Sequence, residues 1–219
     1  MSTLALVAFL YLVRRHRSHG VTSHAVDDQN GAEQEDPPER KVVGLWTLCK
    51  KLRWLATAVF LCFAVTMVFP VFTQEILSVR DPSTSPRLFQ KASFIPLAFL
   101  LWNAGDLVGR LLTLVPQLRL IQYPRFLFAF SLLRLAFIPL YLLCNVRGQG
   151  AAINSDTFYL IIVQFLFGLS NGWLGSNCMM GAVEWVDVDE REAAGGFMGL
   201  MLVAGLTVGS LLSFLTARA

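Results

Sequence analysis

Five apolar runs, each long enough to cross a lipid bilayer, constrain the fold of this chain more than any other feature. A spanning helix needs about 20 predominantly apolar residues, because the hydrocarbon core is about 30 Å thick. The runs cover about 54–72, 92–115, 126–144, 158–180 and 193–214. Hydrophobic residues make up 55% of the chain and charged residues 15%, which excludes an ordinary water-soluble domain. The sequence therefore predicts an all-α integral membrane protein, with a five-helix, multi-span bundle over residues 52–219.

The N-terminal part differs from the rest in composition. Residues 4–13 are apolar but too short to span, and their flanking arginines follow the run, whereas those of a secretory signal precede it. We interpret residues 1–13 as the end of a truncated transmembrane helix. Residues 14–51 are polar, with a Pro37-Pro38 pair, and bury too little apolar area to offset the entropy of ordering. They are predicted to form a disordered cytoplasmic loop.

The distribution of Lys and Arg predicts the orientation of the spans. Eleven basic residues lie in 14–53 and in the connections at 119–125 and 191, against five in the connections on the alternate side. By the positive-inside rule the first group is cytoplasmic. Five spans then place the C-terminus on the extracytoplasmic side.

The second run is unusual because it carries an Asn, an Asp and an Arg. Asn103, Asp106 and Arg110 are three and four positions apart and therefore share one face of a helix. A charge at the bilayer centre costs roughly 2.5–3.5 kcal/mol on insertion scales, so such charges pair or line a wet cavity. Asp106 and Arg110, one turn apart, are able to do both.

Four other polar residues lie in or beside the runs. Arg134 must face the bundle or snorkel, and snorkelling or a structural ion pair is favoured over substrate contact. Glu75, at the end of the first run, is a candidate gate residue. Asn171 and Asn177 either line a pathway or bond between helices.

Glycines spaced four apart predict close approach between spans. Gly168 and Gly172 form one such pair, and the last run contains two more, so it is expected to lie against a neighbour. Within the third run, Pro139 is expected to kink the helix.

Metal or cofactor chemistry is not favoured by the remaining residues. His16, His19 and His24 lie close together, but no Cys or further ligand is nearby, so a metal site there is the less favoured interpretation. The cysteines have no paired spacing and are interpreted as free, buried thiols; they are Cys49, Cys62, Cys144 and Cys178. The acidic run 184–192 lacks the glycine and ligand spacing of a calcium loop, and is interpreted as a solvated loop. We expect no metal and no cofactor.

The run around Asp106 resembles the eighth spanning helix of the equilibrative nucleoside transporter family, whose pattern is aromatic-Asn-x-x-Asp-x-x-Gly-Arg. Here it reads Trp102-Asn-Ala-Gly-Asp-Leu-Val-Gly-Arg110. Four further stretches are similar to that family in the same order, so the resemblance covers the chain from about Lys41 to its end. They are Thr66-Met-Val-Phe-Pro70 with Glu75, Leu133–Pro139 with Leu143-Cys-Asn145, Ser170-Asn-Gly172 with Cys178-Met179, and Glu192-Ala-Ala-Gly195.

The resemblance implies the C-terminal half of an eleven-helix transporter with major-facilitator-like architecture. It would move nucleosides, or alternatively nucleobases, down their gradient by alternating access. It also implies that Asn103, Asp106 and Arg110 belong to the substrate site, with the carboxylate accepting from ribose hydroxyls and the guanidinium donating to them. Phe99 and Trp102 would shield the base.

Helices one to five of that pattern, and most of six, have no counterpart in the sequence. We therefore expect this half alone to be inactive, and its partners to be nucleosides, the lipid bilayer, and a missing N-terminal half or a full-length transporter. Nucleic acid is not expected as a partner. The alternative is a non-transporting interaction partner or regulator of a full-length transporter; a channel is a further option. The sequence contains no recognisable arrangement of catalytic residues, so we do not expect an enzyme. The expected location is the plasma membrane or a vacuolar or lysosomal membrane.

Overall fold

The computed structural model describes residues 44–80 and 86–218, with side chains as far as Phe214. The expected truncated helix and most of the expected loop fall on residues 1–43 and lie outside this part of the chain. The described residues form helices and a single isolated bridge between Ile76 and Val146. Five of the helical segments are long and apolar enough to cross a membrane, so the multi-span helical prediction is confirmed.

Helix α2 (Leu45–Glu75) is packed on several sides by the other helices. Eight of its buried residues recur at alternating steps of four and three, which places them on one stripe; they are Leu48, Leu52, Leu55, Val59, Cys62, Thr66, Phe69 and Thr73. Ala56, Ala58, Ala64 and Val65 are buried as well. The helix begins at Leu45 and not near Trp54, because no Gly or Pro lies between Gly44 and Trp54, and Lys and Arg are good helix formers. The basic residues at 50–53 therefore lie on the helix.

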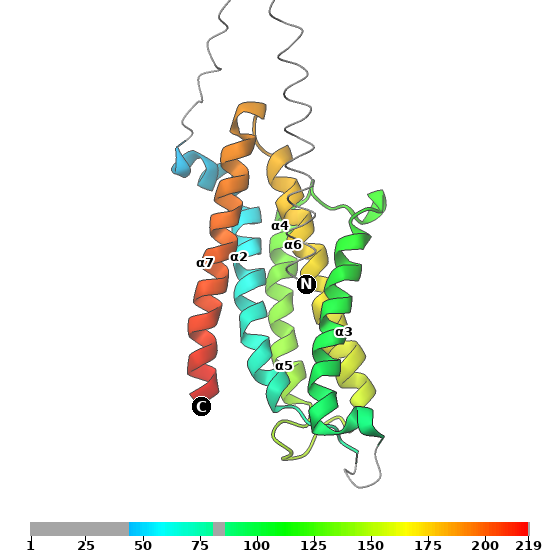
Figure 1. Cartoon of the computed structure of the whole chain (residues 1–219). Coiled ribbons are helices and arrows are strands. Elements are labelled where there is room, and N and C mark those ends of the chain that lie inside the picture. The colour runs from blue at the N-terminus through cyan, green and yellow to red at the C-terminus, as the bar shows by residue number, and fades with distance from the viewer. Residues whose placement is uncertain (1–43, 81–85, 219) are drawn as a thin grey trace, which may run out of the picture. The chain divides into compact units, whose positions relative to one another are not determined.

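Two helix pairs make the most extensive contacts of the bundle. Helix α2 packs against α7 (Arg191–Arg218), and α3 (Lys91–Leu112) packs against α6 (Leu166–Glu184) (Figure 1). A π-helical segment, η4 (Phe158–Phe165), leads into α6. Short 3-10 turns lie in the connections, namely η1 (Arg87–Phe89), η2 (Pro116–Leu118) and η5 (Val188–Glu190).

Glycines bring the backbones of α3 and α6 into direct contact. A Cβ added to Gly168 would overlap the carbonyl oxygen of Trp102, and one added to Gly172 would overlap that of Asp106. On the facing helix, Gly105 and Gly109 meet the α6 backbone in the same way. The predicted close approach at Gly168 and Gly172 is confirmed, and the complementary pair on α3 completes it.

The last helix uses only one of its two predicted glycine pairs. Gly205 and Gly209 touch the backbone of α2 at Phe60 and Ala64, so the expected neighbour is confirmed. Among the residues that the structure describes, a Cβ on Gly195 or Gly199 would meet nothing within 4 Å. That pair does not mediate close packing.

The third span is not a single regular helix. It consists of α4 (Pro124–Leu133), the 3-10 turn η3 (Arg134–Ala136) and α5 (Phe137–Leu142). Pro139 has no N–H for the carbonyl of Leu135, four residues earlier, and its ring crowds that carbonyl. The irregular turn lies where this bond is missing, which agrees with the distortion expected at Pro139.

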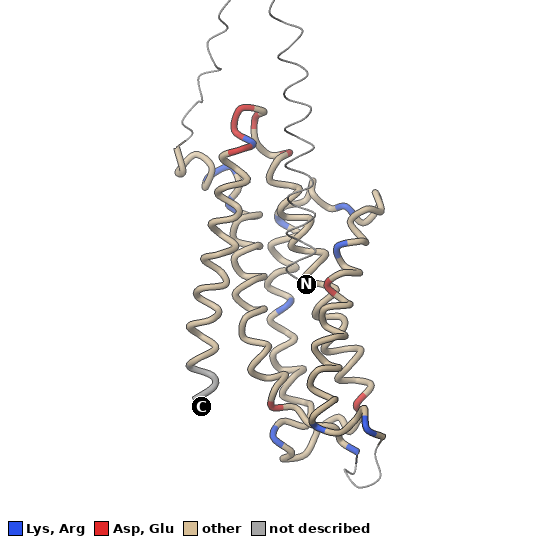
Figure 2. The backbone as a smooth tube through the Cα atoms, in the orientation of Figure 1, with Lys and Arg blue, Asp and Glu red and all other residues tan. Residues whose placement is uncertain are grey.

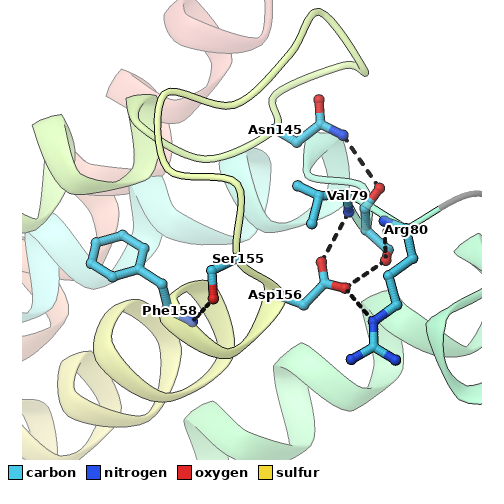
Figure 3. Close-up of polar contacts among 7 residues, drawn as sticks. Val79, Arg80, Asn145, Ser155, Asp156 and Phe158 are labelled. Atoms are coloured by element: carbon cyan, nitrogen blue, oxygen red, sulfur yellow. Dashed lines mark hydrogen bonds and ion pairs between the residues drawn. The ribbon is translucent and has the colours of Figure 1, made fainter.

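Asp156 connects the segment that follows α2 with the connection between α5 and η4. Its carboxylate accepts hydrogen bonds from Ser78 Oγ at 2.8 Å and from the Val79 backbone N–H at 2.9 Å, and pairs with Arg80 Nε at 3.3 Å (Figure 3). Asn145 Nδ2 donates to the Ser78 carbonyl at 3.3 Å. Asp156 is almost fully buried, so these partners satisfy a carboxylate that would otherwise be costly there.

Charged residues gather toward the ends of the helices (Figure 2). At the end where α2 begins, Lys51 Nζ lies 3.0 Å from Asp187 Oδ2 and 2.6 Å from Glu190 Oε2. Asp187 and Glu190 also form a capping box on η5. The interpretation of the acidic run as a merely solvated loop is wrong, because its carboxylates bind a lysine of α2.

The cysteines differ in exposure, which predicts a simple labelling pattern. All four are free thiols; Cys62, Cys144 and Cys178 are buried, but Cys49 is exposed, so the expectation that it is buried is wrong. Burial also raises the pKa of the Cys144 thiol to about 11, which lowers its thiolate fraction at neutral pH.

We expect a maleimide to modify Cys49 first, as read by mass spectrometry of the intact chain. Equal modification of Cys178 would contradict this packing.

Candidate functional site

The centre of the site is an ion pair within α3. Arg110 Nε donates to Asp106 Oδ2 at 2.8 Å, from one turn further along the helix. The Asp106 side chain is 18% exposed and that of Arg110 57%. The pairing expected from the spacing is therefore present, with a sheltered carboxylate and a more open guanidinium.

Asn171, on α6, holds the other oxygen of this carboxylate. Its Nδ2 donates to Asp106 Oδ1 at 2.8 Å, and its Oδ1 lies 2.7 Å from Thr66 Oγ1, on α2. The contact at Gly172 brings the α6 backbone against α3 at the level of Asp106. The glycine packing thus sets the distance across which Asn171 reaches the carboxylate.

Arg134 lies deep in the bundle on the other side of Thr66. It is 1% exposed, and its Nη1 donates to the carbonyl oxygen of Cys62 at 3.2 Å and to Cys62 Sγ at 2.6 Å. Its guanidinium also covers the ring of Phe167, with 4.5 Å to the ring centroid. Arg134 neither snorkels nor pairs with a carboxylate within the described part of the chain, so both favoured expectations for it are wrong. Carbonyl, thiol and aromatic groups stabilise the charge instead.

These contacts form one polar network across three helices and a turn. It runs from Arg110 through Asp106 to Asn171, then through Thr66 and Cys62 to Arg134 in η3; Thr66 Oγ1 lies 3.5 Å from Arg134 Nη2 and closes the last step. The network gives each oxygen of the Asp106 carboxylate a donor, which holds the side chain in one orientation.

A cleft of about 390 Å³ opens beside the network, between the α2–α7 pair and the α3–α6 pair. Arg110 and Asn171 line it together with small and apolar residues; these include Phe63, Thr113, Gly175, Ser176, Met179 and Leu202. Its volume lies within the range of small-molecule sites. The structure thus places one member of the ion pair at a cavity able to accept a small polar solute.

The other residues predicted for the substrate site lie apart from this cleft. Asn103 is exposed, and its amide donates back to the Phe99 carbonyl at 2.7 Å on the same helix. Phe99 and Trp102 line a small separate pocket with residues of α2 and with Gln164 of η4. Within the described chain no partner satisfies the buried indole N–H of Trp102. The structure therefore brings Asp106, Arg110 and Asn171 together, but does not add the two aromatic rings to the same cavity.

Asn177 and Glu75 both bond to connecting segments. Asn177 is fully buried, accepts from the Leu120 backbone N–H at 2.9 Å and donates to the Trp173 carbonyl at 2.9 Å. Glu75 pairs with Arg147 Nε at 3.0 Å, after the end of the α5 helix. In this geometry Asn177 anchors the connection between α3 and α4, and Glu75 that between α5 and η4.

Sequence reasoning missed several polar residues of the interior. Gln164 Nε2 donates to Thr73 Oγ1 at 2.8 Å and to Tyr159 Oη at 2.6 Å, and Thr66 and Cys62 complete the network described above. A glutamine inside an apolar run was a usable signal. The thiol of Cys62 was not, because only the fold places it against Arg134. No cluster of three or more metal-ligating side chains occurs among the residues that the structure describes.

The fold and this site define the class of protein: a multi-pass integral membrane protein with a polar, charged site built between its spans. Comparison with known proteins adds the family. A family profile described as Nucleoside transporter matches residues 13–218. The chain is 38% identical over 177 residues to the nucleoside transporter FUN26 of Saccharomyces cerevisiae, covering 76% of this chain and 33% of that protein. It is 36% identical over 190 residues to human equilibrative nucleoside transporter 2, covering 84% and 40%.

Human equilibrative nucleoside transporter 1 is 32% identical over 208 residues, covering 90% of this chain and 43% of that protein. The chain therefore belongs to the nucleoside transporter family, which consists of carriers and not of enzymes. This confirms the family resemblance of its motifs. The chain spans between a third and about two fifths of the length of these curated relatives.

Proposed function

We propose that this chain supplies half of the substrate path of a facilitative nucleoside carrier, with Asp106 and Arg110 recognising the ribose. The observation that carries the proposal is the ion pair between these residues beside the cleft of about 390 Å³. An ionised carboxylate accepts hydrogen bonds from vicinal hydroxyls, and a guanidinium donates several in a fixed fork. Neutral, hydroxyl-rich solutes such as nucleosides suit a pair whose own charges cancel.

The polar residues exposed along α3 support the idea that another part of the protein covers this helix. Asn103 and Arg110 are exposed on it, although a charge facing hydrocarbon is costly. The chain spans only part of the length of its relatives. We infer that the remaining part of the carrier covers this face of α3 and completes the substrate path. Rocking of the two halves about the path would then alternate its access.

Uptake of radiolabelled uridine and adenosine in transporter-deficient cells tests the proposal. The comparison is between the 219-residue chain and a form extended at its N-terminus to the length of the relatives, called the extended form below. We expect uptake by the extended form, and background uptake by the 219-residue chain at equal membrane abundance. Background uptake by both would contradict the proposed function.

Uptake by the 219-residue chain alone would overturn the idea that it is an inactive half. A non-transporting role as a partner of a full-length transporter has a distinct signature. The chain would then co-purify with that transporter and change its uptake rate, whereas the extended form would transport nothing by itself.

A further inference from the structure

A second cleft, of about 620 Å³, lies at the end of the bundle where α2 begins. The starts of α2 and α4 form its walls, and the end of α6 adds Trp185. Four basic residues line it, namely Lys50, Lys51, Arg53 and Arg125. The other lining residues are mostly aromatic, and are Trp54, Gln122, Tyr123, Pro124, Phe126 and Trp185. No carboxylate lines this cleft within the described chain.

Three of the four cations have no acidic partner among the described residues. Lys51 is neutralised by Asp187 and Glu190. Lys50 and Arg53 instead lie over aromatic rings, with 5.6 Å from Lys50 Nζ to the Trp46 ring and 5.1 Å from Arg53 Cζ to the Trp54 ring. A ring face orients a cation without cancelling its charge. The cleft therefore keeps a surplus of positive charge that a multiply charged anion would satisfy.

The aromatic residues place the cleft at the level of a membrane interface. Trp and Tyr are enriched where spanning helices meet the headgroup region. Trp185 is fixed in this position, because its indole N–H donates to the Ile121 carbonyl at 2.9 Å. Tyr123 and Phe126 are exposed beside it, so the cleft has an apolar wall as well as a basic one.

We propose that this cleft binds the headgroup of an anionic membrane phospholipid that carries phosphate groups in addition to its phosphodiester. The three cations would contact the phosphates, and the exposed ring of Phe126 would contact the glycerol and upper acyl chains. Basic pockets between spanning helices are known to suit such headgroups. A soluble phosphate would use the cations but not the apolar wall. The site is separate from the proposed substrate path and does not depend on it.

Binding of a fluorescent short-chain phosphatidylinositol bisphosphate to the detergent-purified 219-residue chain tests this site. We expect saturable binding, measured by fluorescence polarisation, that the unlabelled short-chain lipid displaces. Short-chain phosphatidylcholine should not displace it, and inositol trisphosphate, the free headgroup, should displace it at least tenfold less well than the lipid. Equal displacement by the free headgroup would overturn the assignment to a lipid.

A matched pair of variants locates the site. Arg53→Gln with Arg125→Gln should weaken lipid binding at least tenfold. Arg87→Gln with Lys91→Gln removes the same charge at the opposite end of the bundle, and should change binding less than twofold. Equal effects of the two variants, or none from the first, would overturn the proposal. If the first variant does not fold, lipid binding by Arg125→Gln alone is measured, and its affinity is expected to fall at least threefold. An unchanged affinity of this variant would also overturn the proposal.

Discussion

Asp106→Asn is expected to reduce nucleoside uptake by the extended form at least tenfold, while its abundance in the membrane changes less than twofold. Asparagine keeps the size of the side chain and one acceptor oxygen for Arg110. It removes the negative charge and the second carboxylate oxygen, which accepts from Asn171 and which we propose also accepts from the ribose hydroxyls. Uptake at saturating and limiting uridine, with membrane abundance from surface labelling, separates the two quantities.

Glu184→Gln is the matched control for this variant. It neutralises an exposed carboxylate in the last turn of α6, outside the network, and should leave uptake unchanged. Parallel losses of uptake and abundance in Asp106→Asn would mean that the ion pair with Arg110 has only a structural role.

Gly172→Ala is expected to destabilise the bundle by about 1–3 kcal/mol or more, because the added methyl group overlaps the backbone at Asp106. The gap between α3 and α6 cannot widen locally, since Gly105, Gly109 and Gly168 hold the same contact along its length. The substitution should therefore also pull Asn171 away from the Asp106 carboxylate. Thermal unfolding of the detergent-purified chain measures the loss of stability.

Gly199→Ala is a control for which no loss of stability is expected. No atom of the described part of the chain lies within 4 Å of the position that its methyl group would occupy, and Ala favours a helix over Gly by about 1 kcal/mol. This variant should be neutral or slightly stabilised. Equal unfolding temperatures for Gly172→Ala and Gly199→Ala would contradict the close packing of α3 on α6.

The parts of this structure that depend on local pattern could be predicted from the sequence. Apolar length gives the spans, the helical period gives the pairing of Asp106 with Arg110, and spacing by four gives the contact at Gly172. The partners of these groups depend on how separate helices are rotated and aligned, which no local pattern specifies. The contact of Asn171 with Asp106 is of this kind.

Arg134 shows the same limit of prediction from sequence, here for the partners of a buried charge. The expense of a membrane-embedded charge predicted that Arg134 needs a partner, and carboxylates or the membrane surface were the partners favoured from sequence. The fold instead surrounds it with the Cys62 carbonyl and thiol and the ring of Phe167. Such partners carry no charge, so they leave no trace in the distribution of charged residues.

Ribose recognition by Asp106 is tested most directly by equilibrium binding of uridine and 2′,3′-dideoxyuridine to the purified extended form and its Asp106→Asn variant. We predict that the unsubstituted form prefers uridine at least tenfold, about 1.4 kcal/mol, and that Asp106→Asn binds both compounds with similar affinity. Retention of the full preference for uridine in Asp106→Asn would show that the hydroxyls are recognised elsewhere, and would contradict the site proposed for this chain.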